Sequence, residues 1–375
     1  MKLLTVLGAR PQFVKASVVS MALKRRGVLE TIVHTGQHFD PNMSDVFFDE
    51  LGIAPPAHHL DVNGGGHAEM TGRMMIGLEP LVERVKPDAV LVYGDTNSTL
   101  AGTLVAAKLH LPVAHVEAGL RSHNLRMPEE INRIVTDRLS RWLFVPTPLA
   151  ASHLRDEGVD SGRIHLVGDV MLDVAIQHGQ RAAELGPGVL ATEGLEGAHY
   201  ALATIHRAEN TNEPARLGQI VQALERVALH MRVVWPLHPR TRAILAREGL
   251  LERCVRAMTL LEPQGYLDMV RLETSAAVIA TDSGGVQKEA FFHRVPCVTL
   301  RDETEWMELV ESGWNTLVPP RDSHSMADAI LTAVGTTGRE IEPYGRGDAS
   351  ERIARVLLDA SVDAGPLASV VRLPA

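Results

Sequence analysis

Two carboxylates lie just beyond the ends of short apolar runs. Asp95 follows the run 89–93, and Glu117 follows the run 113–116. If these runs are neighbouring parallel strands, a strand spacing of about 4.8 Å brings both carboxylates to one rim. Like charges that close favour one protonated and one ionised carboxyl, which suits acid–base chemistry. Taken alone, Asp95 is more typical of a cap on the helix expected from Thr96, whereas Glu117 has no obvious capping role.

Two cations, Arg10 and Lys15, follow the first apolar run, where an anionic group could dock at a helix start. A solvated Arg and Lys at a helix start explain them equally well. The turn itself reads Gly8-Ala9-Arg10-Pro11-Gln12 and lacks the G-x-G-x-x-G series of a dinucleotide-binding turn. A nicotinamide cofactor is therefore disfavoured at this turn.

The segment Met127-Pro128-Glu129-Glu130 opens a helix with proline and two acids, which is ordinary chemistry for a helix start. Arg121, Arg126 and Arg133 flank these acids and could screen them or bind a phosphate. The sequence leaves both roles open.

The segment 281–289 follows another apolar run, and its small residues Ser283, Gly284 and Gly285 leave helix N–H groups bare for a phosphate. Glu289 lies one turn further, where it could accept hydrogen bonds from both ribose hydroxyls. A Ser or Asp cap with glycine for tight helix–sheet packing is an equally good reading.

Two further cations, His206 and Arg207, follow the run 200–204 and could bind a diphosphate. A lone histidine beside a strand is usually structural, and the 17 histidines show no metal-binding spacing, so we expect no metal.

Apolar, β-branched runs alternate with helical spacing along the chain, which predicts parallel βαβ units and an α/β protein of two doubly wound domains. The expected strands are 3–7, 31–34, 89–93, 113–116, 142–145, 164–167, 200–204, 232–235, 277–281 and 296–300. The expected helices include 14–26, 96–110, 128–140, 214–229, 284–293 and 349–360. Ligands of such sheets bind at the carboxyl ends of the strands, so two domains would place a site in the cleft between them.

Composition agrees with this architecture, because 375 residues favour two domains and 45% apolar residues can form a large core. A net charge of -9 disfavours nucleic-acid binding, and Cys254 and Cys297 form no disulfide framework or cysteine-based zinc motif. No run is long enough for a membrane span, and no signal peptide is recognisable. We expect a cytoplasmic protein that binds neither nucleic acid nor membrane.

Several motifs in order resemble the non-hydrolysing UDP-N-acetylglucosamine 2-epimerase family, whose members have the two-domain GT-B fold. They are Gly8-Ala9-Arg10-Pro11, Thr35-Gly36-Gln37-His38, Gly94-Asp95-Thr96, His115-Val116-Glu117-Ala118-Gly119-Leu120-Arg121, Pro128-Glu129-Glu130, His206-Arg207, Asp282-Ser283-Gly284-Gly285 and Arg301-Asp302. The resemblance implies Rossmann-like domains over 1–170 and 171–348, an active-site cleft between them, and a final helix of about 349–375 that could pack back on the first. A homodimer without a cofactor is expected from the family.

The implied reaction interconverts UDP-GlcNAc and UDP-ManNAc for cell-surface polysaccharide precursors. UDP leaves C1, a carboxylate removes the C2 hydrogen to give 2-acetamidoglucal, and re-addition delivers a proton to the opposite face. The resemblance implies catalytic roles for Asp95, Glu117, Glu129 and His206. It implies UDP-sugar contacts for Arg10, Lys15, Arg133, Gln264, Met269, Ser283, Gly284, Gly285 and Glu289. Candidates for a second UDP-sugar site are Gln37, His38, Arg73 and Arg207.

The sequence departs from the family at several positions. Met269 stands where many members have an aromatic residue, and Trp306 stands where they often have Arg. The segment 39–42 lacks the Arg and Glu or Gln of regulated members, so allosteric activation is not carried over. The motifs around Gln12 and 304–308 resemble a branch whose members include enzymes acting on UDP-2,3-diacetamido-2,3-dideoxyglucuronate. That sugar is the alternative substrate, and a GT-B glycosyltransferase, a hydrolysing epimerase and a non-catalytic UDP-sugar sensor are alternative functions.

Overall fold

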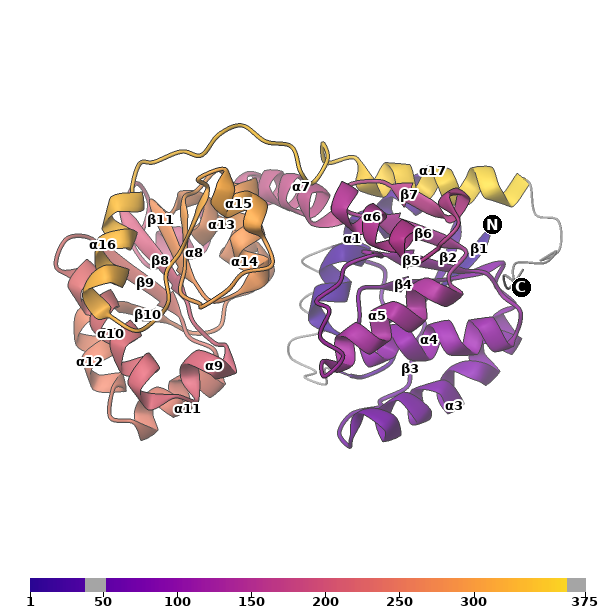
Figure 1. The fold of residues 1–375 in the computed structure, drawn as a ribbon, viewed down its shortest axis with the longest axis horizontal. Helices are drawn as coiled ribbons and strands as arrows, with labels where there is room; N and C mark the ends of the chain where they lie inside the picture. Colours follow the sequence, from indigo (N-terminus) through magenta and orange to yellow (C-terminus); the bar gives the residue numbers. More distant parts are fainter. Residues whose placement is uncertain (38–51, 363–375) are drawn as a thin grey trace. The chain divides into compact units, whose positions relative to one another are not determined.

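The computed structural model describes residues 1–37 and 52–362, with the backbone alone for Arg10 and 360–362. The chain divides into two compact units. Unit 1 comprises residues 1–174 and the segment that begins at Pro343, and unit 2 comprises residues 175–342. Each unit is built on one parallel sheet with helices on its faces (Figure 1). None of the helices described has both the length and the apolar character needed to cross a membrane.

Unit 1 contains a seven-stranded sheet in the order β3-β2-β1-β4-β5-β6-β7. Its strands are β1 (Lys2–Leu7), β2 (Leu29–His34), β3 (His58–His59), β4 (Ala89–Tyr93), β5 (Val113–Val116), β6 (Trp142–Val145) and β7 (Ile164–Leu166). Strands β4 and β5 are parallel neighbours, and Tyr93 pairs with Val116 at their carboxyl ends. The prediction that Asp95 and Glu117 follow adjacent strands is confirmed.

The helices of unit 1 lie between successive strands and pack on the sheet, except α7, which follows β7 and continues into unit 2. They are α1 (Arg10–Arg25), α3 (His67–Val85), α4 (Asn97–Lys108), α5 (Pro128–Leu139), α6 (Pro148–Asp156), the short 3-10 helix η1 (Ser161–Arg163) and α7 (Val170–Glu184), which contains the boundary at 174. Gly102 brings α4 close to the sheet, because a Cβ there would lie 3.1 Å from Val6 and 3.3 Å from Val92. The rim that follows β4 is therefore held against a tightly packed core.

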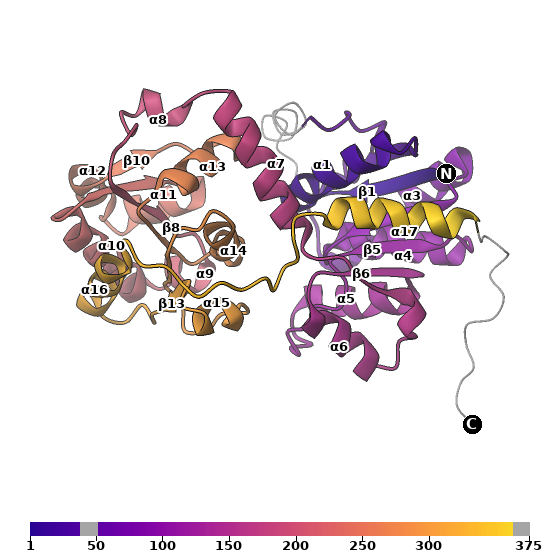
Figure 2. The same cartoon turned by 90° about the horizontal axis from the view of Figure 1, so that it is seen from above.

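The segment from Pro343 returns to unit 1 and ends in α17 (Ala349–Val362), which packs against α1 (Figure 2). Buried Asp173 fixes the start of α17 by accepting hydrogen bonds from the backbone N–H groups of Ala349 (3.1 Å) and Ser350 (2.8 Å). Further along, Glu351 forms ion pairs with Arg25 and Arg26 of unit 1.

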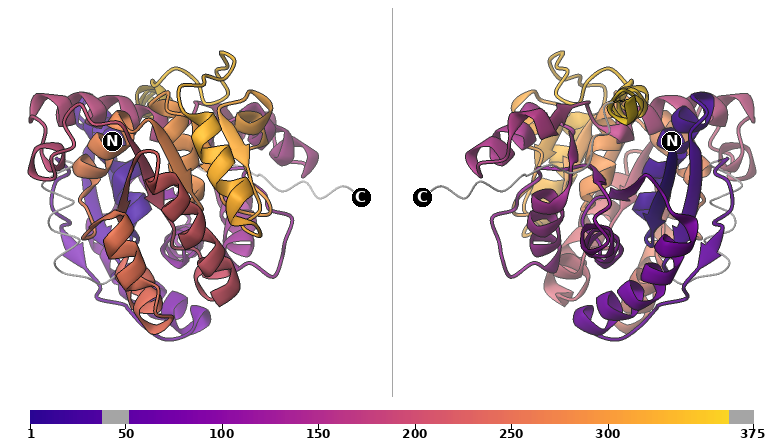
Figure 3. Two further views of the ribbon diagram at one scale, coloured as in Figure 1. Left: turned by 90° about the vertical axis from the view of Figure 1, so that its left-hand side faces the viewer. Right: turned by 90° about the vertical axis from the view of Figure 1, so that its right-hand side faces the viewer.

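Unit 2 contains a six-stranded sheet in the order β10-β9-β8-β11-β12-β13. Its strands are β8 (Tyr200–Thr204), β9 (Arg232–Pro236), β10 (Thr259–Leu261), β11 (Val278–Thr281), β12 (Cys297–Thr299) and β13 (Asn315–Leu317). Its helices are α8 (Val189–Thr192), α9 (Ala208–Thr211), α10 (Pro214–Ala228), α11 (Pro239–Arg247), α12 (Leu251–Ala257), α13 (Tyr266–Ser275), α14 (Gly284–Phe292), α15 (Met307–Glu311) and α16 (Ser323–Ala333). Helices α10 and α16 pack side by side on this sheet (Figure 3).

Candidate active site

Asp95 lies in the turn between β4 and α4. Gly94 adopts a left-handed conformation (φ 60°), and its N–H donates to the carbonyl oxygen of Val116 at 2.9 Å. The Asp95 carboxylate accepts two hydrogen bonds from Arg133, at 2.9 and 2.6 Å. The reading of Asp95 as the helix cap is wrong, because Thr96 occupies that position and its hydroxyl accepts the Thr99 N–H. Asp95 is thus available at the rim with a cation beside it.

Glu117 follows β5 in a left-handed conformation, with φ of 71°. Such a conformation costs a non-glycine residue about 1–3 kcal/mol and persists only where the surroundings enforce it. Here the N–H groups of Glu117 and Ala118 both donate to the carbonyl oxygen of Phe144, at 3.1 Å. The Glu117 carboxylate forms an ion pair with Lys15 of α1, and the two side chains are only 16% and 13% exposed. A strained, largely buried carboxylate at a strand end is typical of a functional residue.

Helix α5 contributes two adjacent acids with different environments. Glu130 is buried and accepts hydrogen bonds from the Ser122 and His123 N–H groups and from Arg133. Burial alone would raise the pKa of Glu130, but the hydrogen bonds from Ser122, Arg133 and His123 outweigh it and lower the pKa. Glu129 is partly exposed and has no hydrogen bond or ion pair within the described residues. Arg133 therefore bridges Asp95 and Glu130, whereas the Glu129 carboxylate has no partner among the residues that the structure describes.

Gln12 ties the turn after β1 to the turn after β4, a role that the sequence did not reveal. Its buried side-chain oxygen accepts the N–H groups of Gly8 (2.8 Å) and Ala9 (3.0 Å). Its amide nitrogen donates to the carbonyl oxygen of Tyr93 at 2.8 Å and to the hydroxyls of Thr96 and Thr99 at 3.0 Å. One side chain thus links the start of α1, which carries Arg10 and Lys15, to the Asp95 turn. The side chain of Arg10 lies outside the described residues.

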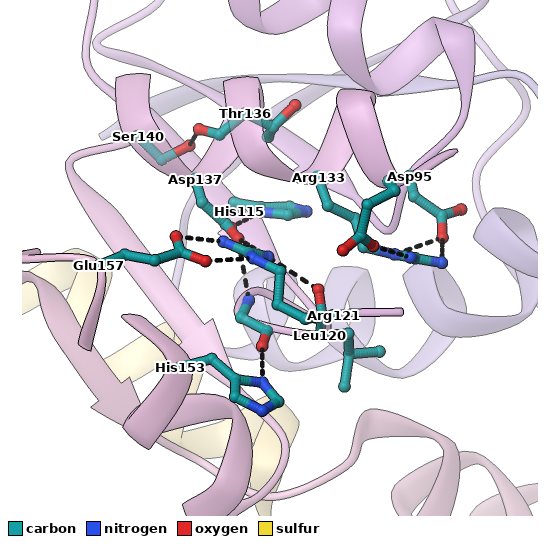
Figure 4. A network of polar contacts seen from close by, with 12 residues as sticks. Asp95, His115, Leu120, Arg121, Arg133, Thr136, Asp137, Ser140, His153 and Glu157 are labelled. Carbon is teal, nitrogen blue, oxygen red and sulfur yellow. Dashed lines mark hydrogen bonds and ion pairs between the residues drawn. The ribbon is translucent and has the colours of Figure 1, made fainter. Parts of the chain in front are cut away.

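Arg121 pairs with acids other than Glu129 and Glu130, which it flanks in the sequence. It forms ion pairs with Asp137 at 2.8 Å and with Glu157 at 2.6 Å (Figure 4). Asp137, on α5, also accepts the N–H of Gly119 at 3.1 Å. These contacts fix the segment that follows Glu117 against α5.

In unit 2, Asp282 organises the loop that follows β8. It is fully buried and accepts the backbone N–H groups of His206 (3.0 Å) and Arg207 (3.0 Å) and the side-chain amide of Asn210 (3.0 Å). Asp282 therefore does not cap α14. Ser283 occupies the cap position without a side-chain cap hydrogen bond, so the side-chain cap expected there as an alternative is absent. The first-turn N–H groups at Gly284 and Gly285 remain open to an anion.

Glu289 is half-buried and lies near Tyr266 and Glu273 of α13. Burial raises the pKa of Tyr266 well above its ordinary value, and the charges of Glu289 and Glu273 raise it further. Burial likewise raises the pKa of Glu273, with Glu289 contributing. Gln264 precedes α13, donates to the carbonyl oxygen of Glu262 at 2.7 Å, and like Met269 is partly exposed.

Arg207 and Trp306 border the start of α14. Arg207 lies 4.0 Å from Glu305, whereas the His206 side chain is exposed. The indole N–H of Trp306 donates to the carbonyl oxygen of Gly284 at 2.9 Å. Trp306 thus braces the open first turn of α14 from one side.

Among the candidates for a second UDP-sugar site, Gln37 accepts hydrogen bonds from the N–H and hydroxyl of Ser98. Arg73 is an exposed residue of α3 and lies 3.4 Å from Glu69. His38 lies outside the described residues. A second site stays a prediction.

Residues 21–358 match the family model for UDP-N-acetylglucosamine 2-epimerase. The chain belongs to the UDP-N-acetylglucosamine 2-epimerase family. It is 52% identical to the UDP-2,3-diacetamido-2,3-dideoxy-D-glucuronate 2-epimerase of Pseudomonas aeruginosa over 364 residues, covering 95% of this chain and 99% of the relative. It is 41% identical to the UDP-N-acetylglucosamine 2-epimerase of Methanocaldococcus jannaschii over 363 residues, again covering 95% and 99%.

The crystal structure of the Methanocaldococcus jannaschii UDP-GlcNAc 2-epimerase in complex with UDP-GlcNAc and UDP matches with a TM-score of 0.85 and 40% identity. The match covers 96% of this chain and 100% of that structure. The two-sheet α/β architecture expected from the family resemblance is thereby confirmed.

Proposed function

We propose that the chain is a non-hydrolysing 2-epimerase that inverts C2 of a UDP-2-acetamido sugar. The observation that carries the proposal is the carboxylate rim of unit 1, in which Asp95 and Glu117 follow adjacent strands and each has a cation beside it. Membership of the epimerase family supports the same reaction.

The reaction needs a base because the C2 hydrogen is poorly acidic until the C1–O bond weakens. As UDP departs with the electrons of that bond, a carboxylate takes the C2 proton, and the C–H electrons form the C1–C2 double bond. A second carboxyl then delivers a proton to the opposite face of C2 while UDP adds back to C1. Asp95, Glu117 and Glu129 are the proposed acid–base groups. Because carboxyl protons exchange with water, the product carries a solvent hydrogen at C2.

In unit 1, Lys15 forms an ion pair with Glu117, and Arg133 forms one with Asp95. In unit 2, the uncapped first turn of α14 is the proposed anchor for the diphosphate, with His206 as a neighbouring cation and Glu289 on the ribose hydroxyls. Gln264 and Met269 are proposed to lie near the uracil. Backbone N–H groups suit the departing diphosphate because they stabilise developing negative charge without reorganising.

The preferred substrate that we propose is UDP-2,3-diacetamido-2,3-dideoxyglucuronate. The 52% identity to the Pseudomonas aeruginosa enzyme named for that sugar supports it. The second candidate is UDP-GlcNAc, which the motifs alone ranked first. The 41% identity to the Methanocaldococcus jannaschii enzyme favours this sugar.

The two substrates are distinguished by measuring kcat/KM for each with one enzyme preparation. We expect kcat/KM for the diacetamido glucuronate to exceed that for UDP-GlcNAc by at least about tenfold. A site that pairs with the carboxylate of the glucuronate discriminates against a sugar that lacks this group. Glu117→Gln serves as the inactive control for both sugars. A ratio at or below one would favour UDP-GlcNAc, and release of free sugar with UDP would identify a hydrolase.

Homodimeric assembly and a cytoplasmic location are part of the proposal. Light scattering coupled to size-exclusion chromatography tests the first, and a monomer at micromolar concentration would contradict it. Fractionation of the native cell tests the second.

A further inference from the structure

His115 lies in the middle of β5 with no exposed surface. Both of its ring nitrogens have a close oxygen partner. Nδ1 lies 2.7 Å from a carboxylate oxygen of Asp137, and Nε2 lies 2.7 Å from the carbonyl oxygen of Gly94. Figure 4 shows the ring beneath α5, next to the Asp137 carboxylate.

The partners of His115 determine where its hydrogens are. A backbone carbonyl can only accept, so Nε2 carries a hydrogen. The Asp137 carboxylate already accepts hydrogen bonds from Arg121 and from the Gly119 N–H through its other oxygen, which favours its ionised form. Because Asp137 has no hydrogen to offer, Nδ1 carries one as well.

The charged groups around the ring alternate in sign when His115 is doubly protonated. His115 faces Asp137, Asp137 faces Arg121, and Arg121 faces Glu157. The Asp137 and Arg121 side chains are each only 2% exposed, so a missing charge in this chain would be poorly compensated by water. A neutral ring would also place a lone pair against one of its two acceptors.

We propose that His115 is a buried imidazolium that positions the two turns carrying Asp95 and Glu117. Its Nε2–H holds the carbonyl of Gly94, the residue directly before Asp95. Its Nδ1–H holds Asp137, which in turn fixes the N–H of Gly119, two residues beyond Glu117. His115 is therefore a positioning residue, since its ring bonds to neither catalytic carboxylate.

The backbone gives the reason for a charged anchor. Gly94 and Glu117 both have left-handed φ angles, of 60° and 71°, and the Glu117 conformation is strained. Hydrogen bonds from a charged donor are roughly twice as strong as neutral ones, so the imidazolium holds both turns more firmly than a neutral ring. The catalytic consequence rests on the proposed function, whereas the charge of the ring does not.

The charge is tested without any substrate, by NMR of full-length protein labelled with nitrogen-15 in histidine. We expect one ring that shows slowly exchanging hydrogens on both nitrogens, and we expect these signals to vanish in His115→Asn. A single ring hydrogen on His115 would overturn the proposal. This NMR measurement needs no turnover, so its result is independent of the proposed function. A protein that epimerises neither UDP-sugar would overturn the proposed function and leave the charge of His115 as measured.

The positioning role is tested with His115→Asn, His115→Gln and the exposed control His110→Asn. The amide of Asn or Gln can replace only one of the two hydrogen bonds of His115, and it carries no charge, so the two turns are held less firmly. We therefore expect kcat to fall by at least about tenfold, with KM changed less than about twofold. We expect faster amide hydrogen exchange at 94–95 and 117–119 in both His115 variants and no change in the control. Unchanged kcat and exchange in a folded variant would contradict the positioning role. If both variants fail to fold, the wild-type ring signals still decide the charge.

Discussion

Gln12→Ala probes the link between the two turns of unit 1. The substitution removes the acceptor of two buried backbone N–H groups, those of Gly8 and Ala9, and one donor to the carbonyl of Tyr93. Each buried group left unsatisfied costs about 1–3 kcal/mol, but the Tyr93 carbonyl keeps the hydroxyl of Thr99 at 2.6 Å. The two unsatisfied N–H groups therefore account for the expected loss. At about 1–3 kcal/mol each, they should lower the free energy of unfolding by about 2–6 kcal/mol.

The assay is urea unfolding followed by circular dichroism, with the transition of unit 1 identified by hydrogen exchange. The exposed Glu83→Ala, in α3 of unit 1, is the matched control and should change stability by less than about 0.5 kcal/mol. We also expect lower kcat in Gln12→Ala, because the start of α1 and the Asp95 turn lose their common anchor. A loss as small as that of Glu83→Ala would refute the reasoning.

Three other substitutions test separate parts of the structure. The pKa of Glu130 is lowered in the folded protein, so ionised Glu130 stabilises the fold above its unfolded pKa, and this contribution disappears as the pH falls. Glu130→Gln should therefore lower the free energy of unfolding by about 1–3 kcal/mol at neutral pH. In urea titrations the difference from the wild type should narrow below about pH 4. The pKa of Glu273 is raised, first by burial and then by Glu289, so the folded protein loses stability as the pH rises above about 4.3. Between about pH 5 and 8 the free energy of unfolding should therefore fall less in Glu273→Gln than in the wild type. Parallel curves of unfolding free energy against pH would contradict this. Asp173→Ala removes the hydrogen bonds at the start of α17 and should speed limited proteolysis ahead of that helix by at least about tenfold, whereas an unchanged cleavage rate would show that the helix is held by other contacts.

The sequence predicted the two sheets and the carboxylate rim because those features depend on local patterns. Apolar runs mark the buried strands, and consecutive strands β4 and β5 are neighbours as βαβ units usually are. The strands β3, β10 and β13, of two or three residues each, were not expected. The strands β7 and β12 are equally short, but each lies within a longer expected run, 164–167 and 296–300.

The partners of the rim could not be predicted because they come from distant parts of the chain. Lys15 reaches Glu117 from α1, and Arg133 reaches Asp95 from α5. The link made by Gln12 spans more than eighty residues, to Tyr93 and Thr99. Local reasoning also misassigned the helix cap to Asp95, since Asp and Thr both cap well and only the backbone geometry selects Thr96.

The central claim is that carboxylates of unit 1 remove the C2 hydrogen and return another to the opposite face. Proton NMR in deuterated water, with wild-type enzyme and each UDP-sugar in turn, tests it most directly. We expect deuterium at C2 together with the C2 epimer, and neither with Glu117→Gln. Absence of both exchange and epimer with both sugars in the wild type, or an epimer formed without solvent deuterium, would contradict the account.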